Sequence, residues 1–369
     1  MKRKAILALE NGIFFEGYSF GAEGEGQGEL VFHTGMTGYQ EILTDPSYKG
    51  QMVVMTYPHI GNTGINPQDH ESDRIHLEGF IVKEYCEIPS NWRATQTLSS
   101  FLKEFHIPGI AGIDTRYLTQ LLRSEGSLRG ILSTQTEDPH PLIKKAKSLP
   151  PMEKQNLART VSTSHAYQFH ENGNPKYHVI AFDLGIKKSI LQKLADEQCR
   201  VTVVPLITSA EEVLKLNPDG IFLSNGPGDP AAVQEMQPTL SKLIGKKPIF
   251  GICLGHQILA IALGGKIEKL KFGHHGANHP IQHHITQSIE ITSQNHNFYV
   301  KAHSLPPSVE ITHTNLNDHS IEGFRDREKN ILSIQYHPEA APGPHDSYYI
   351  FNQFVHMMEK QRCQSSTST

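Results

Sequence analysis

Cysteine is scarce in this chain, and the few cysteines have no regular spacing. The four are Cys86, Cys199, Cys253 and Cys363 in 369 residues. Zinc sites and disulfide frameworks both need cysteines at short, recurring intervals, so the sequence predicts neither. The scarcity therefore favours a reducing compartment.

Long hydrophobic runs and a strong charge of one sign are also missing. No stretch approaches the ~18 apolar residues that a membrane span needs. The apolar stretch 5–9 is too short for a signal peptide, because Glu10 interrupts it, and a first strand is the better interpretation. The formal net charge is only −4. We therefore expect a cytoplasmic protein that binds neither membrane nor nucleic acid.

The length and the N-terminal pattern indicate more than one domain. A chain of 369 residues is longer than a domain of roughly 150 residues. Residues 1–145 combine strand-like runs at 28–32 and 51–56 with Gly- and Pro-rich turns and a helical pattern at 115–125. Because strands and helices do not alternate regularly here, we predict a mixed α/β domain.

Two polar segments delimit the rest of the chain. Residues 146–177 include Pro150-Pro151 and indicate a linker or an irregular crossover. Residues 359–369 are polar and are predicted to form a flexible tail. The second domain is therefore expected at 178–358.

Residues 178–358 are predicted to form an α/β domain whose parallel sheet is flanked by helices. Apolar runs and helical patterns alternate, with strands expected at 179–182, 201–205, 220–223 and 248–252 and helices at 187–196, 210–216 and 232–244. This alternation is typical of a parallel sheet covered on both faces. Ligands of such sheets bind beyond the carboxyl ends of the strands, where both the loop 224–230 and Cys253 fall.

Cys253 stands in a motif that favours catalysis. An apolar run ends in Gly251-Ile252-Cys253-Leu254-Gly255, and a helical pattern follows at once. The glycines permit a sharp turn that exposes a nucleophile, and the helix N-terminus favours the thiolate. The alternative is a buried cysteine that acts as a small hydrophobe. Cys86, Cys199 and Cys363 lack such a motif and are predicted to be non-catalytic.

A base for this nucleophile is available in Gln335-Tyr336-His337-Pro338-Glu339. In extended backbone, residues two apart project to the same side, so Glu339 could bond one ring nitrogen of His337 while the other faces the sulfur. The alternative is a strand end with a surface ion pair. The loop 224–230, Ser-Asn-Gly-Pro-Gly-Asp-Pro, could lend an amide to an oxyanion hole or could be a simple turn. It lacks the lysine and hydroxyl residue of a phosphate-binding P-loop.

These pieces, in this order, resemble the class I (triad-type) glutamine amidotransferases. The resemblance implies that Cys253, His337 and Glu339 form a triad that hydrolyses glutamine through a thioester. It also implies that the amide of Leu254 and one from the loop 226–228 stabilise the oxyanion.

The N-terminal half narrows the resemblance to the small subunits of carbamoyl-phosphate synthase. The resemblance covers about residues 5–358, and the segments that carry it are 32–48 (FHTGMTGYQEILTDPSY), 56–62 (TYPHIGN), 113–116 (IDTR) and 271–280 (KFGHHGANHP). By this resemblance, the residues that contact glutamine are Ser47, Gly226, Gly228, Leu254, Gln257, Asn295, Asn297 and Phe298. Ser47 would reach the pocket from the N-terminal domain.

Position 297 departs from that family. The family usually reads Ser-Gln-Asn-His-Gly-Phe, whereas this chain has Asn297 in place of the glycine. Asn is the next most tolerant residue after Gly at positive φ, so a backbone contact to glutamine survives if the backbone is left-handed there. A close approach that leaves no room for a Cβ would not survive.

The resemblance also implies a partner. A large subunit would combine the ammonia with bicarbonate and ATP to make carbamoyl phosphate for arginine and pyrimidine synthesis, because nothing in this sequence resembles an ATP-binding domain. No cofactor is expected in this chain, and ATP and a divalent metal are expected on the large subunit. Five histidines suggest a metal cluster but match no zinc pattern, so we interpret them as structural or interface residues: His274, His275, His279, His283 and His284.

Two other functions remain open. The chain could be a glutaminase for a different synthase or a cysteine hydrolase on a similar sheet, but the N-terminal segments argue against this. It could also be a catalytically silent regulatory subunit, but the intact residues Cys253, His337 and Glu339 argue against that.

Overall fold

The computed structural model describes residues 3–169 and 174–366, which divide into two compact units. The first unit comprises residues 1–155 and 271–276, and the second comprises 156–270 and 277–369. The boundary after Gln155 falls inside the predicted linker 146–177. That segment also contains helix α5 (Ala158–Val161) and strand β10 (Tyr167–Phe169).

Seven strands of the first unit close into a barrel in the order β1-β2-β8-β6-β4-β3-β9. They are β1 (Lys4–Leu9), β2 (Phe14–Ser19), β3 (Glu25–His33), β4 (Gln51–Met55), β6 (Gly79–Ile81), β8 (Gly109–Ala111) and β9 (Arg129–Ser133). The strands β5 (His59–Ile60) and β7 (Glu84–Tyr85) form a separate pair. Pairing is parallel between β3, β4, β6 and β8 and antiparallel elsewhere in the barrel. This confirms the predicted mixed domain, but its closure was not predicted.

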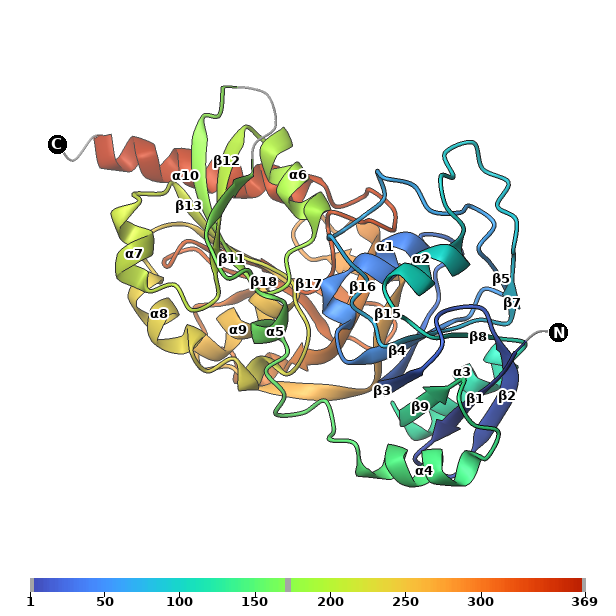
Figure 1. The fold of residues 1–369 in the computed structure, drawn as a ribbon. Helices are drawn as coiled ribbons and strands as arrows, with labels where there is room; N and C mark the ends of the chain where they lie inside the picture. The colour runs from blue at the N-terminus through green and yellow to red at the C-terminus, as the bar shows by residue number, and fades with distance from the viewer. Residues whose placement is uncertain (1–2, 170–173, 367–369) are drawn as a thin grey trace. The chain divides into compact units, whose positions relative to one another are not determined.

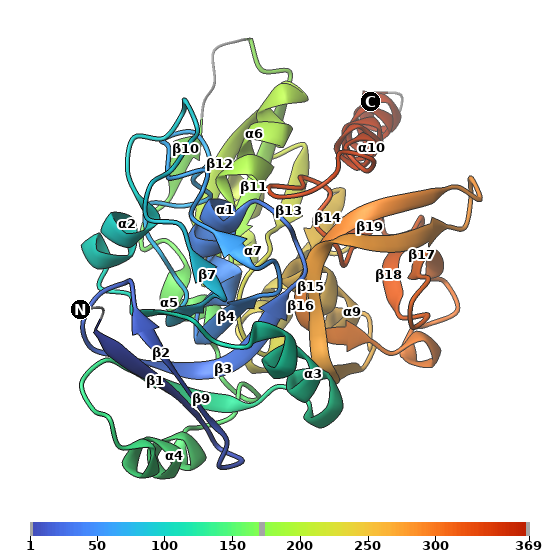
Figure 2. The same ribbon diagram turned by 90° about the vertical axis from the view of Figure 1, so that its right-hand side faces the viewer.

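Helices pack against the strands of this barrel. Because successive strand residues face opposite sides, neighbouring residues of one strand pack with different helices. The helices are α1 (Tyr39–Thr44), η1 (Pro46–Tyr48), α2 (Leu98–Glu104), α3 (Thr115–Glu125) and α4 (Pro139–Ser148). On β4, Val53 packs in one apolar core with α1 and α2, whereas Met52 packs in another with α3. Helix α4 covers β1 and β9 (Figures 1 and 2). The predicted helix at 115–125 is α3, and its first turn is capped by Asp114.

The second unit is built on a ten-stranded sheet in the order β10-β12-β11-β13-β14-β19-β18-β17-β15-β16. Its further strands are β11 (Tyr177–Asp183), β12 (Cys199–Pro205), β13 (Gly220–Leu223), β14 (Ile249–Ile252), β15 (Ile267–His283), β16 (Ile289–Val300), β17 (Glu310–Asn315), β18 (Ile321–Asp326) and β19 (Ile331–Ile334). The strands β12, β11, β13, β14 and β19 are parallel, which confirms the predicted parallel sheet. Antiparallel strands extend it at both ends, as the sequence pattern did not predict.

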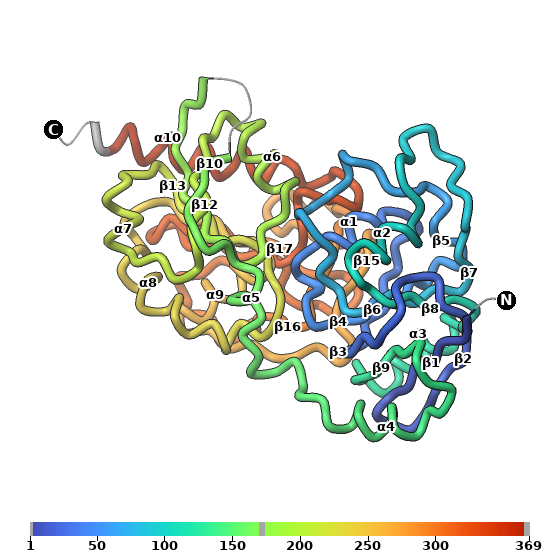
Figure 3. The backbone as a smooth tube through the Cα atoms, viewed as in Figure 1, coloured from blue at the N-terminus to red at the C-terminus, as the bar shows by residue number. Residues whose placement is uncertain are grey.

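Helices cover both faces of this sheet, as predicted. They are α6 (Lys188–Asp196), α7 (Ala210–Lys215), η2 (Pro230–Ala232), α8 (Met236–Leu243), α9 (Leu254–Ala262), η3 (Ala302–Ser304) and α10 (Tyr349–Ser366). On β11, Ile180 packs with α5, α7, α8 and α9, whereas Val179 packs with α6 and α10. Figure 3 shows α8 and α9 lying side by side.

The C-terminal helix α10 includes most of the segment 359–369 that was predicted to be a flexible tail. The helix continues to Ser366, and 367–369 lie outside the described residues. Among the helices of the described ranges, none combines the length and the apolar character that crossing a membrane requires.

Candidate active site

Cys253 occupies the sharp turn that the sequence predicted. It lies between β14 and α9 with φ at 53°, a left-handed conformation that is uncommon for a residue other than glycine. A Cβ added to Gly255 would lie 2.2 Å from the carbonyl oxygen of Leu223, so only glycine lets α9 pack this closely against β13. The amide of Cys253 donates to Ile334 on β19 at 2.8 Å. The neighbouring strands therefore hold the strained turn in place.

His337 and Glu339 follow the end of β19 and are both buried. The Nδ1 of His337 lies 2.7 Å from Oε1 of Glu339, as their spacing predicted. The backbone amide of His337 donates to the carbonyl of Ser293 on β16 at 2.9 Å. The other ring nitrogen of His337, Nε2, is buried, and no contact with it meets the distance and angle limits of a hydrogen bond. The imidazole nevertheless interacts electrostatically with Cys253. Catalytic hydrogen bonds are often this loose before substrate binds.

Neighbouring charges shift the pKa values of His337 and Glu339, the two predicted partners of Cys253. Burial alone would lower the pKa of His337, but the charge of Glu339 and the interaction with Cys253 raise it to about 10. Burial would raise the pKa of Glu339, but the charges of Lys187 and His337 outweigh it and lower this pKa to about 2. His337 is therefore an imidazolium and Glu339 a carboxylate at neutral pH.

Lys187 is a member of this site that sequence reasoning missed. Its buried Nζ donates to Oε1 of Glu339 at 2.8 Å and to the carbonyl of Ala340 at 3.0 Å. The available signal was its position just beyond the carboxyl end of β11, where ligand-binding residues of parallel sheets gather. The sequence pattern instead suggested that Lys187 simply begins a helix.

The loop 224–230 follows β13 and depends on both of its glycines. A Cβ added to Gly226 would lie 2.0 Å from the carbonyl oxygen of Leu184, and Gly228 has φ at 93°. Ser224 fixes the start of the loop, because its Oγ accepts the amide of Leu184 at 2.9 Å. The loop is thus a rigid backbone surface, as an oxyanion or substrate site requires, and its contact with glutamine stays a prediction.

Several predicted substrate residues surround the Cys253 turn on α9 and β16. The thiol of Cys253 donates to the carbonyl of Asn295 at 3.5 Å. The side-chain Nε2 of Gln257 donates to the carbonyl of Phe298 at 2.8 Å and to Oε1 of Gln335 at 3.0 Å. Gln257 therefore ties α9 to β16 in this structure. Leu254 follows Cys253 directly and is the first residue of α9, where backbone amides have no partner within the helix.

The two remaining predicted glutamine contacts, Asn297 and Ser47, lie on different elements, and both contacts stay predictions. Asn297 lies within β16 and is not among the described residues with positive φ, so the left-handed backbone considered for it is wrong. Asn in place of the usual glycine therefore causes no backbone strain here. Ser47 is buried in η1 of the first unit, where its amide donates to Asp45 at 2.9 Å. Its contact with glutamine stays a prediction.

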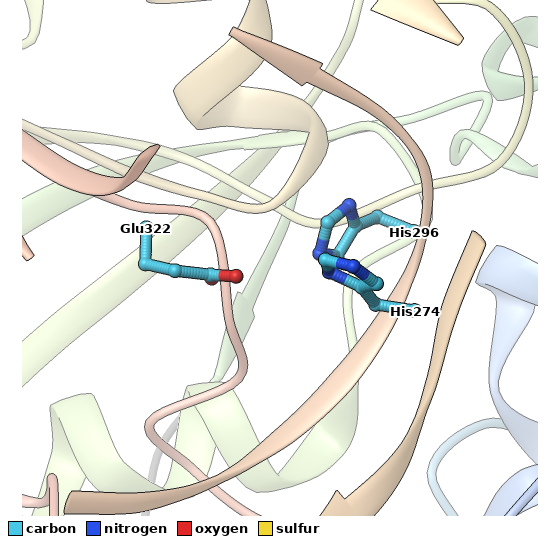
Figure 4. Close-up of side chains that lie close together, drawn as sticks. All are labelled: His274, His296 and Glu322. Atoms are coloured by element: carbon cyan, nitrogen blue, oxygen red, sulfur yellow. The ribbon is translucent and has the colours of Figure 1, made fainter. Parts of the chain in front are cut away.

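Three buried side chains carry atoms that could ligate a metal ion (Figure 4): His274 on β15, His296 on β16 and Glu322 on β18. Their ligating atoms all lie within 4.8 Å of one another. His296 and Glu322 already form hydrogen bonds with neighbouring side chains. The Nε2 of His296 lies 2.9 Å from Oε1 of Gln294, and Glu322 accepts from the amides of Gln294 and Asn315 at 3.0 and 2.9 Å. A side-chain network thus accounts for the polar groups of His296 and Glu322, and the absence of a metal stays a prediction.

Comparisons with known proteins match both parts of the chain. The family model "Glutamine amidotransferase class-I" matches residues 178–357, and the model "Carbamoyl-phosphate synthase small chain, CPSase domain" matches residues 7–132. Proteins named carbamoyl phosphate synthase small chain are similar over nearly their whole length. The one from Syntrophotalea carbinolica is 53% identical and covers 97% of this chain and 99% of its own. The one from Chlorobaculum tepidum is 53% identical (96% and 98% covered), and the one from Aquifex aeolicus is 52% identical (97% and 100% covered).

Proposed function

Because this chain belongs to the carbamoyl-phosphate synthase small-chain family, we propose that its Cys253, His337 and Glu339 hydrolyse glutamine to glutamate and ammonia. The observation that carries the proposal is a cysteine at a strained strand-to-helix turn that interacts with a carboxylate-bound imidazolium. A nucleophile, a base and an orienting group are the three parts that acyl transfer from an amide needs.

The reaction begins when Cys253, as a thiolate whose proton is held by His337, attacks the side-chain amide carbon of glutamine. A carbon–sulfur bond forms, and the electron pair of the carbonyl moves to oxygen to give a tetrahedral oxyanion. The amides of Leu254 and of the loop 226–228 stabilise this charge. When the oxyanion collapses, the carbon–nitrogen bond breaks, and His337 donates its proton to the departing ammonia. Water then attacks the thioester carbon and gives one proton to His337. A carbon–oxygen bond forms and the carbon–sulfur bond breaks, which yields the side-chain carboxyl group of glutamate and the Cys253 thiolate, with its proton again held by His337.

The charges around His337 suit it to both half-reactions. Its raised pKa keeps it protonated before attack, so it holds the proton that ammonia needs. Cys253 is one cause of this raised pKa, and that cause disappears when the sulfur is bound in a neutral thioester. The imidazole is then better able to accept a proton from the attacking water. Glu339, held by Lys187, keeps Nδ1 protonated and the ring oriented throughout.

Ser47, Gly226, Gly228, Leu254, Gln257, Asn295, Asn297 and Phe298 are proposed to bind glutamine. The chain would pass the ammonia to a large subunit, which makes carbamoyl phosphate from ammonia, bicarbonate and ATP for arginine and pyrimidine synthesis. ATP and a divalent metal would then be bound by the large subunit, with no cofactor in this chain. A heterodimer in the cytoplasm is expected. An enclosed path for ammonia is expected as well, because ammonia is mostly protonated, and so not nucleophilic, in neutral water.

The decisive test substitutes Cys253→Ser in this chain and assembles it with its large subunit. Glutamine-dependent synthesis of carbamoyl phosphate should be abolished, while ammonia-dependent synthesis by the same complex persists. Equal glutaminase activity in the variant and the wild type would exclude Cys253 as the nucleophile. Loss of both syntheses would indicate damage to folding or assembly, which co-purification of the two chains would reveal.

A further inference from the structure

Glu290 is a buried carboxylate on β16 that accepts hydrogen bonds from three hydroxyl groups. Its Oε2 accepts from Ser347 at 2.6 Å and, more weakly, from Tyr336 at 3.4 Å. Its Oε1 accepts from Tyr349 at 2.7 Å. Burying a carboxylate is costly unless hydrogen bonds compensate, so a carboxylate bonded in this way indicates a specific role.

The three hydroxyl groups come from both sides of the catalytic segment. Tyr336 immediately precedes His337 in the chain. Ser347 and Tyr349 lie beyond the loop that follows Glu339, where α10 begins. Glu290 therefore bonds the chain just before His337 and again after the loop that follows Glu339.

Both tyrosines remain hydrogen-bond donors at neutral pH. Burial and the charge of Glu290 raise the pKa of Tyr336 well above its usual value, and the same two causes raise the pKa of Tyr349. Tyr349 also lies near His313, whose Nε2 is 3.3 Å from the tyrosine oxygen. Burial, with smaller contributions from His283 and His284, lowers the pKa of His313 to about 2, so this ring is neutral.

The loop between these anchors needs to be held in place. Ala340 and Ala341 have φ at 60° and 48°, left-handed conformations that each cost roughly 1 kcal/mol or more for a residue with a Cβ. Strand β16 binds the far side of the loop a second time, because the amide of Ile291 donates to Asp346 at 2.9 Å. Without these anchors, the strained turn after Glu339 could relax and carry the carboxylate with it.

We propose that Glu290 is a positioning residue for glutamine hydrolysis, which it serves by clamping the segment 336–349 against β16 so that His337 and Glu339 stay aligned with Cys253. The inference rests on the proposed function, because it concerns the same triad. The hydrogen bonds of Glu290 go to the chain on either side of the triad, through which it acts.

Two variants test the clamp in this chain assembled with its large subunit. Glu290→Gln removes the charge and one acceptor oxygen, whereas the double variant Ser347→Ala/Tyr349→Phe removes two donors and no charge. For both, we expect kcat for glutamine to fall about tenfold while KM stays within about threefold, because misalignment affects the transition state more than binding. The rate of Cys253 alkylation by iodoacetamide at neutral pH, followed by peptide mass spectrometry, should fall as the imidazole moves away from the sulfur.

The matched control is Asp326→Asn on β18. Asp326 is also buried and accepts a hydroxyl, from Ser308 at 3.1 Å, but it lies outside the catalytic segment. This control should lower thermal stability yet keep the kcat and the Cys253 alkylation rate of the wild type. If the folded double variant keeps both as well, the clamp has no positioning role. Should Glu290→Gln fail to fold, the double variant decides alone. A wild type without glutaminase activity would instead refute the proposed function.

Discussion

Replacing Lys187 by methionine should remove the cation that holds Glu339 ionised inside the protein. The pKa of Glu339 lies at about 2 instead of 4.5, and a difference of about 2.5 pH units corresponds to about 3 kcal/mol at 1.36 kcal/mol per unit. Lys187 contributes more than His337 to this lowering. Breaking a buried ion pair by removing one partner typically costs about 3–5 kcal/mol. We therefore expect Lys187→Met to lose about 3 kcal/mol of unfolding free energy at pH 7.

The loss should depend on pH in a definite direction. Because the pKa of Glu339 is depressed in the folded state, its stabilisation is present above the unfolded value of 4.5 and is lost as pH falls toward about 2. The difference in unfolding free energy between wild type and Lys187→Met should therefore be largest at pH 7 and should decrease below pH 4.5. Urea denaturation across this pH range measures it. The kcat for glutamine should also fall by about tenfold or more, because Glu339 no longer orients His337 firmly.

Lys242→Met provides the control for this substitution. Lys242 pairs with Glu211 at 2.8 Å, but both side chains are exposed, so losing the pair should leave stability nearly unchanged. If Lys187→Met unfolds at the same urea concentration as Lys242→Met and keeps the wild-type kcat, the buried ion pair stabilises neither the fold nor the triad.

Three further predictions follow from the same structure. Gly255→Ala should destabilise the protein by about 3 kcal/mol, because the new Cβ would lie 2.2 Å from a backbone oxygen. In the control Gly245→Ala the Cβ meets no atom within 4 Å, so only about 1 kcal/mol of backbone strain is expected. Thermal unfolding of the two variants compares these losses. The pKa of His337 is raised from 6.5 to about 10, so its stabilisation should be complete below pH 6.5 and disappear as pH rises to 10, and His337→Gln should flatten this part of the stability profile. Cys199 is buried with its pKa raised to about 12, so native protein at pH 8 should be alkylated at the exposed Cys363 but not at Cys199, as mass spectrometry can check.

The sequence predicted the parallel part of the second unit well, because its strands are short apolar runs separated by amphipathic helices. The strand expected at 201–205 lies within β12, and that expected at 220–223 is β13. The helix expected at 232–244 is shorter, since α8 begins only at Met236. Pro238 has no amide hydrogen and is tolerated in the first turn, which explains this late start.

The antiparallel strands and the barrel could not be predicted in the same way. Strand β15 contains glycine, proline and four histidines, so it has neither the apolar run nor the strict alternation that indicates a strand. The barrel closes through pairs such as β1 with β9, which are distant in the chain. Such pairing depends on which strands meet in three dimensions, and no local pattern records it.

The same distinction applies to the candidate site. His337 and Glu339 were paired correctly because two residues in extended backbone project to one side, which is a local property. The partnership of Lys187 with Glu339 and that of Glu290 with Ser347 were missed, because each joins segments far apart in the chain.

The amino-acid sequence alone determined the glycine-flanked turn at Cys253 and the family, and it predicted the nucleophile and the order of the triad, since each is written in a short run of residues. The tertiary structure decided which charges and hydroxyl groups surround that triad. These groups meet because β11, β13, β14 and β19 are neighbours in the sheet, although β12 and β15 to β18 lie between them in the chain. This order brings the carboxyl ends that carry Lys187, Cys253 and His337 to one edge of the sheet, where their charges act on one another.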